Sequence, residues 1–280
     1  MLARRESTGI GGISVATMGE TSRKRQDRVL RKLLEKKHIS VKQLAEEFRI
    51  SEATARRDLK ALAETGQLML VHGGARLPAM RDFSFQAKKI RNIEAKRIIG
   101  RLAAELVADG DQVFLDSGTT CFELAVQLQS KQGVTVLANS ARFTQELSSP
   151  SLLVFILGGR YRPDRLDMVG PMATQALTPL RGFIAFIGAD GLSREPGPAA
   201  SDMESAELFG LATRNARETV LLVDHDKFDQ AALCQITSWN RISTVVSDRR
   251  PNQEWIEFFS DAHIKLIYPN SNPSSNINPT

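Results

Sequence analysis

The stretch Ser51-Glu52-Ala53-Thr54-Ala55-Arg56-Arg57-Asp58-Leu59 decides how the first part of the chain folds. Ser51 is a favoured N-cap residue, so a helix is expected to begin directly after it. The helical period places apolar side chains on the inward side of this helix and polar side chains on the outward side. The inward set is Ala55, Leu59 and Leu62, and the outward set is Thr54, Arg56 and Arg57.

A second short helix is expected just before this stretch. The apolar residues Val41, Leu44, Ala45 and Phe48 follow the spacing i, i+3, i+4, i+7, which is typical of one face of a helix. Arg49-Ile50 then forms a tight break. Two short helices, a tight turn and paired arginines early in the second helix are typical of a helix-turn-helix, whose second helix enters the major groove of DNA.

The paired arginines also allow a plainer interpretation, because charged side chains on an exposed helix are usually only a solvated face. Two neighbouring hydroxyl residues favour the DNA interpretation. Ser51 and Thr54 cluster with the arginines at the helix N-terminus, where N–H groups and the helix dipole favour phosphate oxygens. We therefore predict that this helix binds double-stranded DNA.

The distribution of charge supports this prediction. The chain of 280 residues has a net charge of +5 and suits two domains better than one. Residues 23–60 hold 13 Lys/Arg and 6 Asp/Glu, a local charge of +7, which leaves −2 for the rest. A basic module on a mildly acidic body indicates a nucleic-acid footprint at one end. A helix expected over 23–36 opens with a basic first turn, for which simple solubility is the competing explanation.

Composition argues against several other classes of protein. Cys121 and Cys234 are the only cysteines and form no C-x-x-C pair, so a disulfide scaffold and a cysteine zinc site are not expected. His225 lies between two aspartates but has no second ligand at a fixed spacing, so a structural role is the better interpretation. No apolar run is long enough to cross a membrane, and no secretion signal is visible. We expect a cytoplasmic protein without a metal or cofactor.

A β-wing is expected after the helix-turn-helix. Gly66 is a helix stop, the run 68–71 is prone to form a strand, and Gly73-Gly74 suits a turn. Such a wing lies along the DNA backbone, and its glycines allow close approach. The competing interpretation is a plain hairpin that completes the small core.

These two motifs together resemble a known family. The stretch L-A-E-E-F-R-I-S-E-A-T-A-R-R-D-L (44–59), followed by G-Q-L-M-L-V-H-G-G-A (66–75), is similar to part of the DeoR family of bacterial transcriptional repressors. The similarity covers the DNA-binding domain of that family, over residues 23–78. It implies that Arg56 and Arg57 meet DNA from the recognition helix.

The resemblance also implies that the wing at 72–74 supports docking on DNA. Two positions depart from the family pattern: Ala55 stands in place of the usual isoleucine, and Leu70 in place of the usual arginine. The second departure removes one expected phosphate contact. The predicted DNA-contacting residues are Arg23, Arg25, Lys42, Ser51, Thr54, Arg56, Arg57, His72 and Gly73.

The remainder of the chain alternates between apolar runs and helical patterns. A linker is expected at 78–84 and a helical pattern covers 86–108. Seven buried strands are expected at 113–115, 134–137, 152–157, 183–187, 220–223, 244–246 and 264–268. Helices are expected at 121–128, 141–147, 203–216 and 253–259. Repeated βα units with nearly continuous apolar strands predict an α/β domain whose mostly parallel sheet is covered on both faces.

Polar residues cluster directly after these strands, where open α/β sheets bind their ligands. The first strand runs into Asp116-Ser117-Gly118-Thr119-Thr120, whose N–H and O–H donors suit a phosphate at a helix N-terminus. Carboxylate, amide and lysine side chains follow later strands and suit sugar hydroxyls. Each feature alone also fits an ordinary turn or cap, but together they predict a site for a phosphorylated small molecule. The predicted effector-binding residues are Asp116, Ser117, Gly118, Thr119, Thr120, Asn139, Gly158, Gly159, Asp190 and Lys227.

The resemblance to the DeoR family continues over residues 83–250. It is carried by Glu94-Ala95-Lys96, Asp109-Gly110-Asp111, Leu115-Asp116-Ser117-Gly118-Thr119-Thr120, Asn139-Ser140, Leu157-Gly158-Gly159, Val169-Gly170 and Asp224-x-x-Lys227-Phe228. The effector domain of the family is related in fold to ribose-5-phosphate isomerase and binds phosphorylated sugars, so the resemblance implies that fold and that ligand class. Three positions depart from the family pattern: Ala138 replaces threonine, Asp167-Met168 replaces a serine, and 204–209 lacks the usual lysine.

Two functions are compatible with these residues. The favoured one is a cytoplasmic repressor of a carbohydrate-metabolism operon, which a phosphorylated sugar controls. We expect it to assemble as a homodimer or homotetramer on a repeated or palindromic operator. The alternative is a sugar-phosphate isomerase-like enzyme with an accessory DNA module, in which Asp190, Glu204 and Lys227 act as acid–base groups. It is less favoured because kinship in fold does not transfer activity. The expected organisation is a disordered leader at 1–22, a winged helix-turn-helix at 23–78, an effector domain at 79–268 and a disordered tail at 269–280.

Overall fold

The computed structural model describes residues 22–36, 38–64, 68–76 and 85–269. The chain divides into two compact units, Met1–Pro78 and Ala79–Thr280. Apart from Ser22, the expected leader lies outside the described residues, and so does the tail from 270 onward. The helix stop at Gly66 and the linker at 78–84 also lie outside them.

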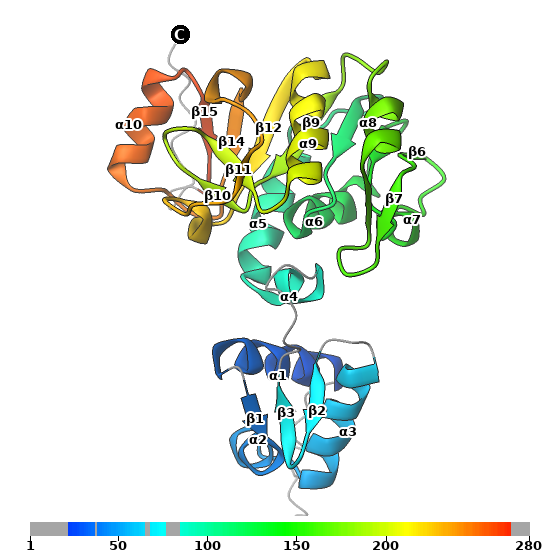
Figure 1. Ribbon diagram of the computed structural model, residues 1–280, viewed down its shortest axis with the longest axis vertical. Helices are drawn as coiled ribbons and strands as arrows, with labels where there is room; N and C mark the ends of the chain where they lie inside the picture. Colours follow the sequence, from blue (N-terminus) through cyan, green and yellow to red (C-terminus); the bar gives the residue numbers. More distant parts are fainter. Residues whose placement is uncertain (1–21, 37, 65–67, 77–84, 270–280) are drawn as a thin grey trace, which may run out of the picture. The chain divides into compact units, whose positions relative to one another are not determined.

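The first unit packs three helices against a small sheet (Figure 1). Its elements are α1 (Ser22–Lys36), β1 (His38–Ser40), α2 (Val41–Phe48), α3 (Glu52–Glu64), β2 (Met69–Val71) and β3 (Gly74–Arg76). The strands are antiparallel, in the order β1-β3-β2. Leu33, Leu44 and Leu59, one from each helix, are all buried. The predicted helices and wing are confirmed, whereas β1 was not predicted because three residues carry no readable period.

Capping groups fix the turn between α2 and α3. At the start of α2, Ser40 and Gln43 each accept a hydrogen bond from the backbone N–H of the other, both at 3.1 Å. Arg49 ends α2 in the left-handed conformation, with φ at 53°. Oγ of Ser51 then accepts a hydrogen bond from the N–H of Thr54 at 3.1 Å, which confirms the predicted N-cap of α3.

The second unit is built on a seven-stranded sheet in the order β15-β14-β12-β9-β4-β5-β6. Every neighbouring pair in it runs parallel. The strands are β4 (Gln112–Leu115), β5 (Thr135–Ala138), β6 (Leu153–Ile156), β9 (Ile184–Gly188), β12 (Glu218–Leu222), β14 (Thr244–Val246) and β15 (Lys265–Ile267). All seven predicted strands are found in this sheet, so the prediction of a parallel α/β domain is confirmed. The prediction that every strand is buried is wrong for β6, an edge strand whose Leu153 and Phe155 are exposed.

Helices cover both faces of the sheet, as predicted. One core includes side chains of α5 (Ile93–Ala104), α6 (Thr119–Leu128) and α7 (Phe143–Glu146), and the other includes side chains of α8 (Pro171–Leu177), α9 (Met203–Asn215) and α10 (Gln253–Asp261). Alternation along β4 divides the two cores: Val113 and Leu115 belong to the first and Phe114 to the second. Among the described helices, none is long and apolar enough to cross a membrane.

The order of the strands reverses between β4 and β9. From β4 the chain adds β5 and β6 on one side, and then returns to add β9, β12, β14 and β15 on the other. In open α/β sheets the ligand binds beyond the carboxyl ends of the strands at such a reversal. The loops after β4 and β9 are therefore the first place to look for a ligand site.

Several elements of this unit differ from the predictions. The single helix predicted over 86–108 is wrong: it is two helices, α4 (Phe85–Ile90) and α5, because Asn92 adopts a left-handed φ of 52°. Short elements within the predicted loops were also missed, since too few residues repeat to show a period. They are β7 (Arg160–Arg162), β8 (Asp167–Val169), α8, β10 (Gly191–Leu192), β11 (Pro198–Ala200), η1 (His225–Lys227), β13 (Cys234–Gln235) and η2 (Trp239–Arg241).

Candidate DNA-binding and effector sites

The outward side of α3 carries the predicted recognition residues. Arg56 and Arg57 are both exposed, and Thr54 is half-buried beside them. Nη2 of Arg56 lies 2.9 Å from Oε2 of Glu52, one turn earlier. An exposed pair at this spacing contributes only about 0.3–0.5 kcal/mol, so DNA phosphates or bases compete with it readily. Oγ of Ser51 lies 2.9 Å from Oγ1 of Thr54 and places both hydroxyls at the start of the helix.

The wing presents His72 and Gly73, both exposed, between β2 and β3. Gly73 has a φ of +75°, which glycine adopts without steric cost. A Cβ on the buried Gly74 would lie 2.2 Å from the carbonyl oxygen of Ile39, so this position must be glycine for β3 to pack on β1. The two glycines therefore have different roles. Lys42, also predicted to contact DNA, is exposed on α2.

Arg25 was predicted to contact DNA, but in the structure it is bound to α3. Its Nε and Nη2 lie 2.5 and 3.1 Å from the two carboxylate oxygens of Asp58. Asp58 is only 2% exposed, so this ion pair joins α1 to α3 inside the unit. The structure gives Arg25 a role within the fold that the sequence did not predict. The side chain of Arg23 lies outside the described part of the chain.

The loops after β4 and β9 meet at Asp116. Its Oδ2 accepts a hydrogen bond from the backbone N–H of Gly188 at 2.5 Å, and its Oδ1 accepts one from the N–H of Gly118 at 2.6 Å. Burial raises the pKa of Asp116, although both N–H donors act in the opposite direction. This carboxyl group thus holds the two loops together at the reversal of the strand order.

The predicted phosphate loop opens α6. Gly118 is the N-cap residue in an extended conformation, and Thr119 and Thr120 form the first turn with little exposure to solvent. Ser117 donates a hydrogen bond from Oγ to Oδ2 of Asp167 at 2.9 Å. The first N–H groups of a helix have no partner within the helix, which makes this turn suited to an anion.

Asp190, after β9, holds an ion pair that the sequence did not predict. Its Oδ1 lies 2.5 Å from Nζ of Lys88, and its Oδ2 accepts a hydrogen bond from the N–H of Ser201 at 2.9 Å. Burial acts to raise the pKa of Asp190, but the charge of Lys88 and the hydrogen bonds from Lys88 and Ser201 together outweigh burial and lower that pKa to about 2. Lys88 belongs to α4, the first described helix after the segment that joins the two units.

Lys96 is a second functional candidate that sequence reasoning missed. It lies on α5 and is only 4% exposed. Its Nζ donates to the carbonyl oxygen of Lys88 and, at 2.6 Å, to that of Arg91. Burial lowers the pKa of Lys96 to about 8, while the charge of Asp224 acts in the opposite direction. Lys96 could have been found from the sequence, because it is a lysine within the apolar stripe of a predicted helix.

The loop after β12 brings the predicted Lys227 near this corner of the unit. Asn92, between α4 and α5, donates from Nδ2 to Oδ1 of Asp224 at 3.3 Å and to Oδ2 of Asp226 at 2.8 Å. Lys227 is half-buried in η1, close enough that its charge contributes to the lowered pKa of Lys96. Residues that follow β9 and β12 therefore both contact the segment where α4 ends and α5 begins.

Arg162, on β7, joins the start of β8 to the start of α9 through a set of charged hydrogen bonds. Its Nε and Nη2 donate to the two carboxylate oxygens of Asp167 at 2.8 and 2.6 Å. It also donates at 2.8 Å to both Asp202 and Ser205, which cap or begin α9. Burial opposes the charged form, but the two carboxylates raise the pKa of Arg162. Asp167 thus links the loop at 116–120 to Arg162. In the sequence this position was noted only as a departure from the family pattern.

The remaining predicted residues have different surroundings. Asn139 is fully buried and donates from Nδ2 to the carbonyl oxygen of Met168 at 2.9 Å. Its Oδ1 accepts no hydrogen bond within the described residues. Gly158 is exposed. A Cβ on Gly159 would lie 2.7 Å from the carbonyl oxygen of Val169, so the structure gives Gly159 a packing role beside β8.

His225 joins the loop that follows β12 to the loop that follows β14. Its Nδ1 lies 2.8 Å from Oδ2 of Asp248, and its Nε2 lies 3.4 Å from Oδ1 of Asp226. Throughout the stretches that the structure describes, no three His, Cys, Asp or Glu side chains are arranged to hold a metal ion. The contacts of His225 tie η1 to the loop after β14.

Both units match domains of one protein family. The DeoR-like helix-turn-helix domain matches residues 25–81, and the DeoR C terminal sensor domain matches residues 91–249. The lactose phosphotransferase system repressor of Lactococcus lactis subsp. lactis is 34% identical over 228 residues, which cover 79% of this chain and 89% of that protein. The HTH-type transcriptional repressor GlcR of Bacillus subtilis (strain 168) is 30% identical over 234 residues, with 82% and 89% covered.

Among solved structures, ribose 5-phosphate isomerase A of Methanocaldococcus jannaschii is 19% identical with a TM-score of 0.36, covering 49% of this chain and 55% of that one.

The matched domains and curated relatives are transcriptional regulators, so the alternative prediction of an isomerase-like enzyme is not supported. The match to the sensor domain spans more than half of the chain, and the match to the helix-turn-helix domain covers α2 and α3. The chain therefore belongs to the DeoR family of DNA-binding transcriptional regulators.

Proposed function

We propose that this regulator represses genes of carbohydrate metabolism and that a phosphorylated sugar controls its binding to double-stranded operator DNA. Relatives named as repressors, one of them of a lactose phosphotransferase system, support the first part. The site at the reversal of the strand order supports the second part. We call residues 116–120, 139, 190 and 227 the effector rim.

DNA binding is assigned to the first unit. Arg56 and Arg57 reach the major groove from α3, and Ser51 and Thr54 at its N-terminus hold a phosphate. Lys42 and the wing at His72 and Gly73 contact the DNA backbone, which positions the recognition helix without reading sequence. Their exposure in the structure supports these roles.

The phosphate of the effector is assigned to the first turn of α6. This is the observation that carries the proposal: the turn combines helix N–H groups with Thr119 and Thr120, and it lies at the strand reversal. Acceptors for sugar hydroxyls lie on the neighbouring strand ends. Asp190 is ionised at neutral pH, because its pKa is about 2. Oδ1 of the buried Asn139 has an unused capacity to accept a hydrogen bond within the described residues.

Control of DNA binding requires that the effector favour one conformation of the protein over another. The ion pair between Lys88 and Asp190 offers a physical route. A sugar hydroxyl that binds to Asp190 competes with Lys88, and Lys88 belongs to the first described helix after the segment that joins the two units. Release of α4 by the effector would alter the attachment of the DNA-binding unit.

The operator is proposed to bind more than one chain. A helix-turn-helix reads one half-site, and dimers read two half-sites about one helical turn apart. We therefore keep a homodimer or homotetramer as the proposed assembly, acting in the cytoplasm where the operator DNA lies. Sedimentation velocity with and without a selected DNA site tests the assembly: a single chain per DNA site would contradict it.

Thermal unfolding tests the effector half of the proposal. The full-length protein is heated with each of a panel of sugar phosphates and with the matching unphosphorylated sugars. A ligand that binds only the folded state raises the melting temperature, and the rise grows with the ratio of the ligand concentration to its Kd. We expect a phosphorylated sugar to raise it and its unphosphorylated form not to, and Thr119→Ala to remove the shift. Equal shifts in wild type and in Thr119→Ala would place the site elsewhere.

A further inference from the structure

One strand takes up the hydrogen-bond donors of two residues of the effector rim. Ser117, after β4, donates from Oγ to Oδ2 of Asp167 at 2.9 Å. Asn139, after β5, donates from Nδ2 to the carbonyl oxygen of Met168 at 2.9 Å. Asp167 and Met168 are consecutive residues of β8. Strand β8 therefore determines which atoms of Ser117 and Asn139 remain for a ligand.

In the contact with Asp167, the hydroxyl of Ser117 is the donor. Arg162 already donates to both carboxylate oxygens of Asp167, at 2.8 and 2.6 Å, and an ionised carboxylate only accepts hydrogen bonds. Asp167 is 1% exposed and Ser117 8%, so the contact is held inside the protein. Because a hydroxyl has one proton, Ser117 presents only lone pairs to a ligand.

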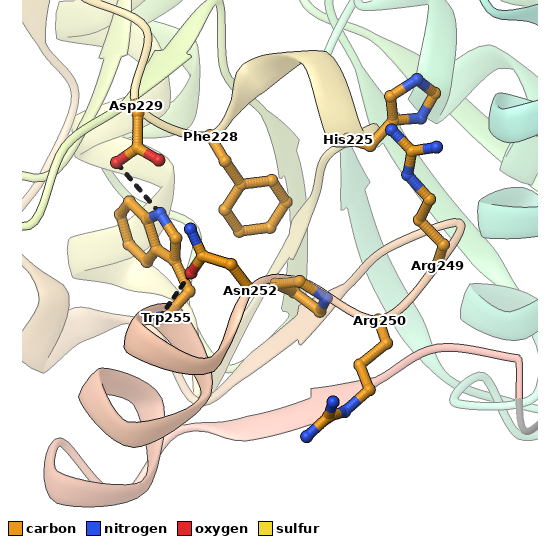
Figure 2. Close-up of a pocket in the computed structure, with 8 residues that line it drawn as sticks. His225, Phe228, Asp229, Arg249, Arg250, Asn252 and Trp255 are labelled. Atoms are coloured by element: carbon orange, nitrogen blue, oxygen red, sulfur yellow. Dashed lines mark hydrogen bonds between the residues drawn. The ribbon is translucent and has the colours of Figure 1, made fainter.

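The amide of Asn139 is restricted in the same way. Its Nδ2 is engaged by Met168, and its Oδ1 has no hydrogen-bond partner within the described residues, although the side chain is fully buried. A buried acceptor without a hydrogen bond is costly and uncommon. Figure 2 shows the usual arrangement in a pocket after β12 and β14, where Asp229 and Asn252 both accept hydrogen bonds from Trp255.

The two acceptors lie at neighbouring strand ends. Leu115 of β4 pairs with Ala138 of β5, so the residues that follow them come out side by side, on strands about 4.8 Å apart. Thr119, in the first turn of α6, has a different role. Its hydroxyl makes no hydrogen bond within the part of the chain that the structure describes, and it can donate to a phosphate. Donors for phosphate and acceptors for another group thus lie within a few residues of each other.

We propose that Ser117 and Asn139 form an acceptor pair that selects phosphate esters carrying hydroxyl groups close to the phosphate. The inference rests on the effector rim of the proposed function and names the ligand class further: a polyhydroxylated ester, as opposed to one whose carbon chain lacks hydroxyls. A phosphate dianion has no proton to donate, so only a hydroxyl of the ligand satisfies the pair. Asp167 is a positioning residue, which acts by directing the proton of Ser117 away from the ligand.

Two small esters test the acceptor pair. Glycerol 3-phosphate and n-propyl phosphate share a phosphate and a three-carbon chain, and only the first has hydroxyls. Phosphorus NMR titration of the full-length protein gives the Kd of each, and their ratio is the selectivity. We expect wild type to bind glycerol 3-phosphate at least about tenfold more tightly, because n-propyl phosphate leaves buried acceptors unpaired.

Variants separate selection from phosphate binding. Ser117→Ala should lower the selectivity at least about threefold and leave the Kd of n-propyl phosphate within about twofold of wild type. Thr119→Ala should weaken both esters alike. Asp167→Ser releases the proton of Ser117 and should also lower the selectivity, but it should cause no further loss in Ser117→Ala/Asp167→Ser, because Asp167 acts through Ser117. Asp261→Ser, at an exposed aspartate of α10, is the matched control.

The outcomes distinguish this inference from the proposed function. Thermal melts of each variant confirm that it folds, and Ser117→Ala decides the question even if Asp167→Ser does not fold. Equal Kd values of the two esters in wild type, or an unchanged selectivity in Ser117→Ala, would overturn the acceptor pair while Thr119→Ala still supports the effector rim. Esters that do not bind, or that Thr119→Ala does not weaken, would overturn the rim and the acceptor pair together.

Discussion

Nζ of Lys88 lies 2.5 Å from Oδ1 of Asp190, across 102 positions of sequence. The contact joins α4, which follows the connection to the DNA-binding unit, to the end of β9, where the effector is proposed to bind. Nearby, Nζ of Lys96 donates hydrogen bonds to the carbonyl oxygens of Lys88 and Arg91. One polar cluster thus connects the candidate site with the start of the second unit.

Replacement of Lys88 by methionine should weaken the response to the effector. Coupling between two ligand sites is typically worth about 1–3 kcal/mol, so loss of this route reduces the effector-dependent change in operator affinity by roughly tenfold. Affinity for DNA without effector should stay within about threefold of wild type, which is less than 1 kcal/mol. Fluorescence anisotropy with a labelled DNA site measures both quantities. Lys265→Met, at an exposed lysine of β15, is the matched control. A full response in Lys88→Met would contradict the proposed route.

The stability of the protein should rise with pH in the alkaline range because of Lys96. Its folded-state pKa is about 8 against an ordinary value of 10.5, since burial disfavours the charged form. Between these values the unfolded chain binds more protons than the folded one, so the free energy of unfolding increases with pH. From pH 7 to pH 10 the gain attributable to Lys96 is about 2 kcal/mol.

The variant Lys96→Met isolates this contribution. It lacks the titrating group, so the wild type should gain stability relative to it as the pH rises, when both are followed by chemical denaturation. Lys265→Met again serves as the control, because its lysine is exposed. Parallel pH profiles for wild type and Lys96→Met would show that the lysine titrates as an ordinary surface group.

Arg25→Met should loosen the DNA-binding unit. The change leaves the carboxylate of Asp58, which is 2% exposed, without its cationic partner. Removal of one member of a buried pair typically costs about 3–5 kcal/mol, and the partial exposure of Arg25 reduces this to roughly 2 kcal/mol. Hydrogen exchange of the α3 amides reports the loss directly. Lys42→Met, at an exposed position of α2, should leave that exchange unchanged.

Arg56→Ala should reduce operator binding by about 1–3 kcal/mol if the side chain reads a base edge. The loss should be larger on the selected site than on random DNA of the same length, because a base contact discriminates between sequences. Binding to both DNAs is compared over a range of salt concentrations. An equal loss on both DNAs, with a salt slope lowered by about one, would make Arg56 a phosphate contact instead.

Local features of this fold were predictable from the sequence. The N-cap at Ser51 and the wing turn at Gly73 depend on residues close together in the chain, and both are present. The seven parallel strands were also predictable, since each is an apolar run bounded by polar loops. Where the pattern was weak the prediction failed: β1 is three residues long, and the break at Asn92 interrupts an otherwise continuous helical period.

The polar contacts of the candidate site could be predicted only in part. Strand ends indicated where Asp116 and Asp190 lie, because parallel strands align their carboxyl ends at one edge. The residues that bind them lie far away in the chain, and no motif or fixed spacing in the sequence links the partners. Arg162 was missed for this reason, although it organises Asp167 and Asp202. Lys88 was missed because a lysine on a short helix looks like any solvated charge.

The most direct test of the central claim is operator binding in the presence of the sugar panel. A DNA site is selected from a random-sequence pool with the full-length protein, and its Kd is measured by fluorescence anisotropy with each sugar phosphate and each matching sugar. We predict that a phosphorylated sugar changes this Kd by at least about tenfold, that its unphosphorylated form does not, and that Thr119→Ala removes the change. A Kd that no member of the panel alters, or that both forms of a sugar alter equally, would contradict control by a phosphorylated sugar.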